Sequence, residues 1–310
     1  MERKQNSAFQ FGNNTSPRYI EPLLIPLQYD QWYSRKQLID LLRNSGLNVE
    51  GGHIVSYNIL AWSLIGLGEL ERRKAGGSTK SLFRLTQLGK QLIDTYSTNT
   101  ELFYDLIHFL FYSTYKRSQR SSNIKSNRFW LYPEVCDSLW LVSPSLVDTL
   151  SLTNQIQIEF REMFSEYDPA FNDRSVGGVF PWLQTLSPSF LSKPGKHQLF
   201  SKRRSNCTPQ LFHLATDMIY NVIEGVQYGS SLAINEQQIE DICKVCLLDP
   251  ERFWNMANLT EMTVNGYEVH QGQWGTSILL AGPPNWITLP NFSNEQTAEN
   301  EDVFEHGGEE

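Results

Sequence analysis

Apolar residues along the chain recur in two spacings, one helical and one alternating, and the spacings change at glycines and at polar residues that can cap helices. The first helical run starts at Ser34, whose side chain can accept backbone N–H bonds, and continues through Leu38 and Leu42. A second run predicts a helix over residues 53–67, which Gly66 and Gly68 would end. Two helices therefore open the ordered part of the chain.

A β-hairpin and a third helix are predicted next. Residues 70–74 and 81–85 form two short extended runs, and residues 75–79, which contain Gly76 and Gly77, can make the turn between them. Thr86 then predicts the start of a helix that continues through Tyr96. The predicted order is helix, helix, hairpin and closing helix.

This order is typical of winged helix-turn-helix domains, and one motif resembles that superfamily. The segment SLFRLTQLGKQLI is similar to the pattern FxLTxxGxxLL that follows the wing in these proteins. The resemblance covers residues 32–97 and implies that the hairpin is a wing. Over its whole length the chain also resembles an uncharacterised prokaryotic family of winged-helix proteins associated with DNA-modification and phage-defence islands.

The remaining sequence predicts two looser versions of the same arrangement. One has helices over residues 153–167 and 175–186 and a second wing over 187–204. The other has helices over 234–246 and 251–259, followed by extended runs at 267–280 and 285–290. The expected fold class is mainly α with small β-hairpin wings (α+β), arranged as tandem winged helix-turn-helix modules.

Composition divides the chain into segments. We expect modules at residues 18–114, 131–215 and 216–293, with a basic linker or loop at 115–130. Residues 1–17 are polar and are expected to be flexible, and residues 294–310 form an acidic tail that is expected to be disordered. The run LFYDLIHFLFYSTY is interrupted by Asp105 and His108, so it predicts a buried helix and no membrane span. Without a signal-peptide pattern, we expect a cytoplasmic protein whose four cysteines are thiols.

Charge is distributed unevenly along the chain. The formal net charge is −8, but residues 1–130 hold 17 Lys and Arg against 10 Asp and Glu, and the other residues hold 9 against 24. A basic half is typical of proteins that bind a polyanion. We therefore expect double-stranded DNA as a partner, and a protein partner is possible through the acidic half.

Three basic clusters are the candidate DNA contacts. The expected contacts are Arg72, Arg73, Lys74, Lys80 and Arg84 in the first hairpin, Lys116, Arg117 and Arg120 in the linker, and Lys202, Arg203 and Arg204 after the second hairpin. Lys193 and Lys196 belong to the third cluster. The alternative interpretation of the hairpin and linker charges is that they only interact with solvent.

The predicted recognition helix, residues 53–67, contains no Lys or Arg. Only His53, Ser56 and Asn58 could read bases there. The domain could bind DNA through wing and backbone contacts with little sequence preference. Alternatively, the chain is a protein-interaction adaptor whose winged helices are docking surfaces without direct DNA contact.

No metal, cofactor or catalytic site is expected. Cys243 and Cys246 form a CxxC, but their helical spacing beside apolar residues predicts buried thiols. The spacing of Cys207 and His213 is not typical of zinc sites. His108 is expected to make a hydrogen bond in the core, and Glu159, Glu162 and Glu166 to lie on a solvated helix face. The sequence contains no Walker A, GxGxxG, GxSxG or HExxH motif, so we expect no enzymatic activity.

Overall fold

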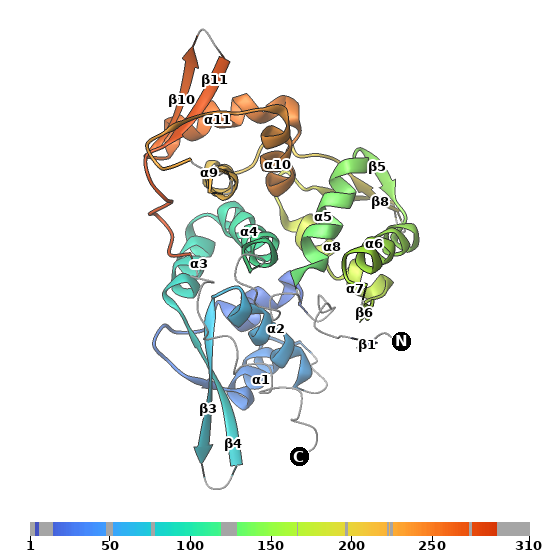
Figure 1. The fold of residues 1–310 in the computed structure, drawn as a ribbon. Helices are drawn as coiled ribbons and strands as arrows, with labels where there is room; N and C mark the ends of the chain where they lie inside the picture. Colours follow the sequence, from blue (N-terminus) through green and yellow to red (C-terminus); the bar gives the residue numbers. More distant parts are fainter. Residues whose placement is uncertain are drawn as a thin grey trace.

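The computed structural model describes residues 4–5, 15–47, 52–75, 78–118, 129–165, 167–195, 198–221, 223, 226–272 and 275–289. The described chain is mainly helical and carries small antiparallel sheets, which agrees with the α+β class (Figure 1). The predicted disorder of the acidic tail lies outside the described residues, as does most of the polar N-terminal segment. Among the described helices, none combines the length and apolar character that crossing a membrane requires.

The first unit spans residues 33–98 and follows the predicted order. It contains β2 (Tyr33–Ser34), α1 (Arg35–Asn44), α2 (His53–Leu64), β3 (Gly68–Ala75), β4 (Ser78–Leu85) and α3 (Gln87–Thr98). Its sheet has the order β2-β4-β3 and is antiparallel. The single-turn helices η2 (Pro17–Tyr19) and η3 (Ile20–Leu24) precede it.

The two predicted helix caps in this unit are confirmed. The Ser34 side chain accepts a bond from the backbone N–H of Gln37, and the Gln37 side chain accepts one from the backbone of Ser34, which completes a capping box. Thr86 caps α3 by accepting from the N–H of Gly89. Each cap satisfies a backbone donor that a helix start otherwise leaves unpaired.

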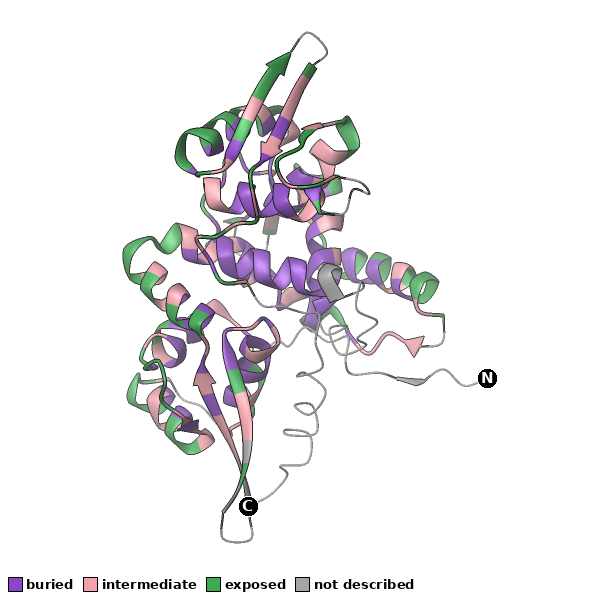
Figure 2. Cartoon of the chain, turned by 60° about the vertical axis from the view of Figure 1, so that its left-hand side comes forward, coloured by how far each residue is buried: buried purple, intermediate pink, exposed green. Residues whose placement is uncertain are grey.

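Helix α4 (Thr100–Ser118) lies at the centre of the molecule. It packs against α3, α5, α8, α9 and α10, and Figure 2 shows it buried along most of its length. The predicted buried helix is therefore confirmed. Because α4 continues through Ser118, the predicted linker begins too early, and Lys116 and Arg117 belong to the helix.

The second unit spans residues 131–201. It contains α5 (Leu131–Val142), β5 (Ser145–Val147), α6 (Thr149–Met163), β6 (Tyr167–Asp168), α7 (Asp173–Gly177), α8 (Phe180–Thr185), β7 (Leu191–Gly195) and β8 (Gln198–Ser201). The sheet order is β5-β8-β7, and the short strand β1 (Lys4–Gln5) pairs with β6. The prediction of one helix over 175–186 is wrong. Pro181 lacks a backbone N–H and lies in the first turn of a new helix, α8.

The third unit spans residues 209–280. It contains α9 (Pro209–Tyr220), β9 (Ser231–Ala233), α10 (Glu236–Cys246), η6 (Pro250–Arg252), α11 (Phe253–Thr263), β10 (Tyr267–Gly272) and β11 (Gly275–Leu280), with the sheet order β10-β11-β9. Both hairpin strands lie inside the run predicted as one strand, and residues 285–289 form no strand. The predicted module boundary between 215 and 216 falls inside α9.

All three units repeat one order of elements. In each, a short strand is followed by at least two helices and then by a hairpin, and the last hairpin strand lies at the centre of the sheet. In the second and third units one further helix, α5 or α9, comes before this short strand. Hairpins β3–β4 and β10–β11 project from opposite ends of the molecule (Figures 1 and 2). Among the described residues, one cluster of buried apolar side chains connects the units. The hairpins are therefore presented on one common core.

Candidate nucleic-acid interface

Hairpin β3–β4 is fixed at its base by two close contacts of glycines. A β-carbon on Gly68 would lie 2.1 Å from Cε2 of Phe83, and one on Gly89 would lie 2.2 Å from the carbonyl oxygen of Leu67. Thr86 joins the same turn, because its hydroxyl donates to the carbonyl of Gly66 at 2.6 Å. These contacts explain the Leu-Thr-x-x-Gly pattern. The threonine caps α3, and the glycine lets α3 pack against the end of the loop that precedes the hairpin.

Two arginines of the hairpin lie against one tryptophan. The guanidinium carbon of Arg84 is 4.7 Å from the ring centroid of Trp32, and that of Arg73 is 5.3 Å from it. Trp32 directly precedes β2, which pairs with β4, so the sheet itself brings the three side chains together. Their stacking on the ring holds two cations side by side on the surface.

Each of these arginines also pairs with a glutamate of β3. Arg73 donates two hydrogen bonds to the carboxylate of Glu71, both 2.9 Å long, and Arg84 donates one of 2.6 Å to Glu69. The bond from Arg73 lowers the pKa of Glu71 below its ordinary value. The side chains of Arg73 and Arg84 remain 51% and 33% exposed, so both can still reach a ligand in solution.

The other hairpin cations are known by their backbone positions. The register places Arg72 opposite Ser81, Arg73 opposite Lys80 and Lys74 opposite Thr79. The side chains of Arg72, Lys74 and Lys80 lie outside the described residues. The predicted cluster therefore occupies the half of the hairpin nearer its turn, with Arg84 at its base.

Helix α2 presents few polar groups to solvent. His53 and Tyr57 are exposed, but the side chain of Asn58 is buried and donates to the carbonyl of Ile54 at 2.8 Å. The prediction that Asn58 could read bases is therefore wrong. The Ser56 hydroxyl donates to the carbonyl of Gly52 at 3.1 Å. Base readout through α2 would depend on His53 and Tyr57.

The other predicted contacts differ in their surroundings. Lys202 and Lys193 are exposed, whereas Lys196, Arg120 and the side chains of Lys116 and Arg117 lie outside the described residues. Arg203 is half-buried, its Nε donating to the carbonyl of Trp140 at 3.1 Å and its guanidinium lying 4.2 Å from the centroid of that ring. Trp140 therefore holds Arg203 within the fold.

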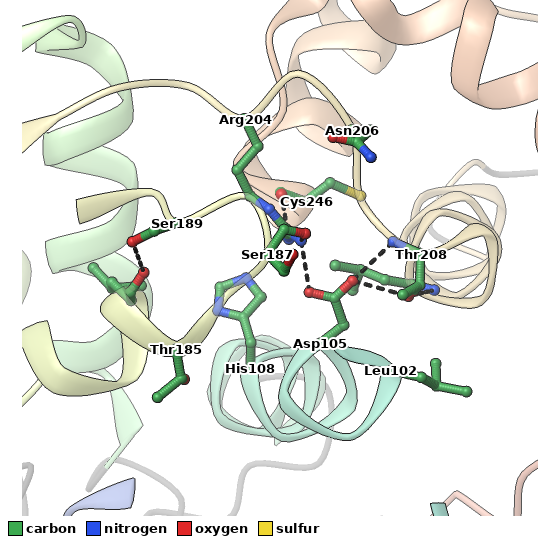
Figure 3. Close-up of polar contacts among 12 residues, drawn as sticks. Leu102, Asp105, His108, Thr185, Ser187, Ser189, Arg204, Asn206, Thr208 and Cys246 are labelled. Atoms are coloured by element: carbon green, nitrogen blue, oxygen red, sulfur yellow. Dashed lines mark hydrogen bonds and ion pairs between the residues drawn. The ribbon is translucent and has the colours of Figure 1, made fainter. Parts of the chain in front are cut away.

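The prediction that Arg204 contacts DNA is wrong, because its side chain is fully buried and points toward Asp105 of α4 (Figure 3). Its Nη2 lies 2.9 Å from Oδ1 of Asp105, which is also fully buried, and donates to the carbonyl of Ser187 at 2.7 Å. Burial alone lowers the pKa of Arg204, but the Asp105 charge raises it above its ordinary value. This arginine connects α4 to the chain between the second and third units.

The predicted structural roles of His108 and of the CxxC are confirmed. Nε2 of His108 is 2.8 Å from the carbonyl oxygen of Val245, and Nδ1 is 3.0 Å from the Tyr132 hydroxyl. Cys207, Cys243 and Cys246 are all buried, and burial raises the pKa of Cys246. Over the described part of the chain, no group of three or more His, Cys, Asp or Glu is arranged to hold a metal ion.

The hairpins of the three units differ in charge. Hairpin β3–β4 has five Lys and Arg against two Glu, residues 191–201 have two Lys and no acid, and residues 267–280 have one Glu and no Lys or Arg. The first hairpin is therefore the strongest candidate for an anion-binding surface. Comparisons with family models, curated proteins and solved structures give no match to this chain.

Proposed function

We propose that the chain consists of tandem winged-helix units and binds double-stranded DNA through the wing formed by β3–β4. The shared order of elements and the central position of the last hairpin strand in each sheet support the winged-helix assignment. The resemblances of the sequence extend the proposal to a regulator or accessory subunit of a prokaryotic defence or DNA-modification system.

The observation that carries this proposal is the pair of arginines on Trp32. A guanidinium matches the geometry of phosphate oxygens and is weakly hydrated, so it transfers readily from a carboxylate to a phosphate. Stacking on the ring already restricts the side chains of Arg73 and Arg84, so they lose less conformational entropy when they bind a ligand. Two such cations on a projecting hairpin suit contact with a DNA backbone.

The surface of α2 supports binding with little sequence preference. Bases are usually read in the major groove by Arg, Lys, Asn or Gln, and α2 exposes none of these. Phosphate contacts position a protein on DNA but carry no sequence information. The wing would therefore supply most of the affinity, and the affinity would depend strongly on salt.

A salt titration with two matched variants tests the proposal. The hairpin variant combines Arg73→Ala with Arg84→Ala. The control combines Arg161→Ala with Arg174→Ala, which removes the same charge from exposed positions on α6 and α7. Binding to a random duplex is measured at several salt concentrations for the intact chain and both variants.

The hairpin variant should bind more weakly and flatten the plot of log K against log salt by about 0.9 for each phosphate that it no longer neutralises. The control should keep the slope of the intact chain. If the two variants bind DNA equally, the arginines contribute only to the net charge of the chain, and the wing does not contact the DNA backbone. If the intact chain does not bind even at low salt, DNA binding itself is rejected.

A specific observation favours a second candidate function, that of a protein-interaction adaptor. Four apolar side chains of the second unit lie within ten residues and are exposed: Leu141 by 56%, Val142 by 54%, Leu146 by 63% and Leu150 by 64%. A contiguous exposed apolar patch marks a protein contact surface, and the short sequence separation of these four residues favours such a patch. If the chain is an adaptor, combining Leu146→Glu with Leu150→Glu should release a stoichiometric protein partner and leave any DNA binding unchanged.

A further inference from the structure

The chain returns from the third unit to the first, close to the basic hairpin. After β11 the chain runs back to α3 (Figure 1). There the backbone N–H of Thr288 donates to Oε1 of Gln91 at 3.1 Å, and Ile287 is buried. Trp286 supports this path, because its ring N–H lies 3.3 Å from Nδ1 of His213. The residues that follow Leu289 therefore start beside the first unit, although the hairpin before them belongs to the third.

Gln91, which binds Thr288 and is here called the anchor, is close in sequence to the candidate DNA contacts. Helix α3 starts at Gln87, directly after hairpin β3–β4, and Gln91 follows in its second turn. A helix rises about 1.5 Å per residue, so Gln91 is only about 6 Å along the helix from its start. Lys90 adds a cation next to the anchor, its Nζ lying 5.3 Å from the ring centroid of Tyr29.

The segment that follows the anchor has the opposite charge to the hairpin. Residues 294–310, here called the acidic segment, contain seven Asp and Glu and no Lys or Arg, whereas the hairpin carries five Lys and Arg against two Glu. If the tail is disordered, as its sequence predicts, a chain of the length of residues 290–310 spans roughly 25 Å on average, comparable to the roughly 27 Å of an eight-residue strand. Tethering at this length gives an effective concentration on the order of millimolar.

We propose that the acidic segment binds in cis to the cations of hairpin β3–β4 and competes there with DNA. The competition rests on the proposed function of the hairpin, but the cis interaction itself does not require DNA. The segment would act as a mimic of the DNA backbone, replacing phosphates with carboxylates on the same arginines. DNA would then bind in full only when the segment is displaced, and the apparent affinity of the intact chain would be lower than that of the exposed hairpin.

The first experiment neutralises the segment in the full-length chain. All seven acids are replaced by their amides (Glu→Gln, and Asp302→Asn), and binding to a random duplex is measured at low salt. We expect about tenfold tighter binding than for the unchanged chain, since the tethered competitor is removed. This gain in DNA affinity should largely disappear when Arg73→Ala and Arg84→Ala are added, because the acidic segment and DNA then no longer compete for the hairpin arginines.

The second experiment detects the cis interaction without DNA. A labelled peptide of residues 290–310 is titrated with the neutralised full-length chain, and fluorescence anisotropy is recorded. Binding should weaken with Arg73→Ala and Arg84→Ala and persist with the control pair Arg161→Ala and Arg174→Ala. Equal weakening by both pairs, or no peptide binding at low salt, overturns the proposal.

The two proposals can fail separately. If neutralisation leaves DNA binding unchanged while the hairpin variant still weakens it, the competition is overturned and the proposed function stands. If the peptide binds through the hairpin arginines but no form of the chain binds DNA, the proposed function and the competition are overturned and the cis interaction stands.

Discussion

Asp105 and Arg204 form an ion pair of 2.9 Å in which both side chains are fully buried. The second carboxylate oxygen of Asp105 accepts from the backbone N–H and the hydroxyl of Thr208, which caps α9 (Figure 3). Arg204 also donates to the carbonyl of Ser187. One buried pair therefore connects the central helix to both the second and the third unit.

Breaking this pair should destabilise the fold strongly. Asp105→Ala leaves the guanidinium of Arg204 buried without its counter-charge, which costs about 3–5 kcal/mol of unfolding free energy. Urea unfolding measures the change. As a control, Asp40→Asn removes an exposed partner of Arg43 at 3.8 Å and should cost less than about 1 kcal/mol. Similar destabilisation in both variants would mean that water reaches the buried pair.

Stability should fall as the pH drops from about 7.5 to 5.5. Burial lowers the pKa of His108 to about 3 and that of His213 to about 4, both below the ordinary value of 6.5. The unfolded chain then binds protons that the folded chain does not, so the unfolding free energy is highest above pH 6.5 and decreases below it. The decrease approaches about 1.4 kcal/mol per pH unit for each histidine, until the pH falls to the folded pKa values.

The variant His108→Gln tests the assignment to His108. The carbonyl of Val245 can only accept, so Nε2 of His108 donates to it and Nδ1 accepts from Tyr132. A glutamine offers one donor and one acceptor without titrating. Unfolding in urea at pH 7.5, 6.5 and 5.5 should give a shallower pH dependence for His108→Gln, with His53→Gln at an exposed position as the control. A slope equal to that of the intact chain would show that His108 takes up its proton in the folded state.

Gly89→Ala should destabilise the junction behind the hairpin. The added β-carbon would lie 2.2 Å from the carbonyl oxygen of Leu67, a backbone atom that cannot rotate away. The expected cost is about 1–3 kcal/mol, measured by chemical unfolding. Gly177→Ala is the matched control, since its β-carbon meets nothing within 4 Å in helix α7. That change should be neutral or stabilising by up to about 1 kcal/mol. A cost at Gly89 no larger than at Gly177 would contradict the close approach.

Local chemistry made the first unit predictable from the sequence. Ser34 and Thr86 indicate helix starts, and the glycine-containing turn between alternating runs indicates the hairpin, so these elements are close to their predicted positions. The second unit was harder to predict. Its predicted helix over 175–186 contains Pro181, which lies in the first turn of a separate short helix, and propensity alone did not show where α7 would end.

The candidate site residues differ in ways that the sequence alone does not predict. Lys202, Arg203 and Arg204 look alike as a basic run, yet the first is exposed, the second packs on Trp140 and the third is fully buried. What separates them is Asp105, a long-range partner that periodicity does not reveal. The same holds for Trp32, because its stacking with Arg73 and Arg84 depends on the pairing of β2 with β4.

Removing the glutamates of the hairpin should strengthen DNA binding. Glu71→Gln and Glu69→Gln take away the carboxylates that now hold Arg73 and Arg84, so both guanidiniums become free to bind phosphates. Binding to a random duplex should tighten at low salt, and the salt slope should steepen by up to about 0.9 for each arginine released. The control pair Glu162→Gln and Glu251→Gln removes the same charge from exposed positions. If the control tightens binding equally, only net charge matters, and the glutamates do not restrain the arginines.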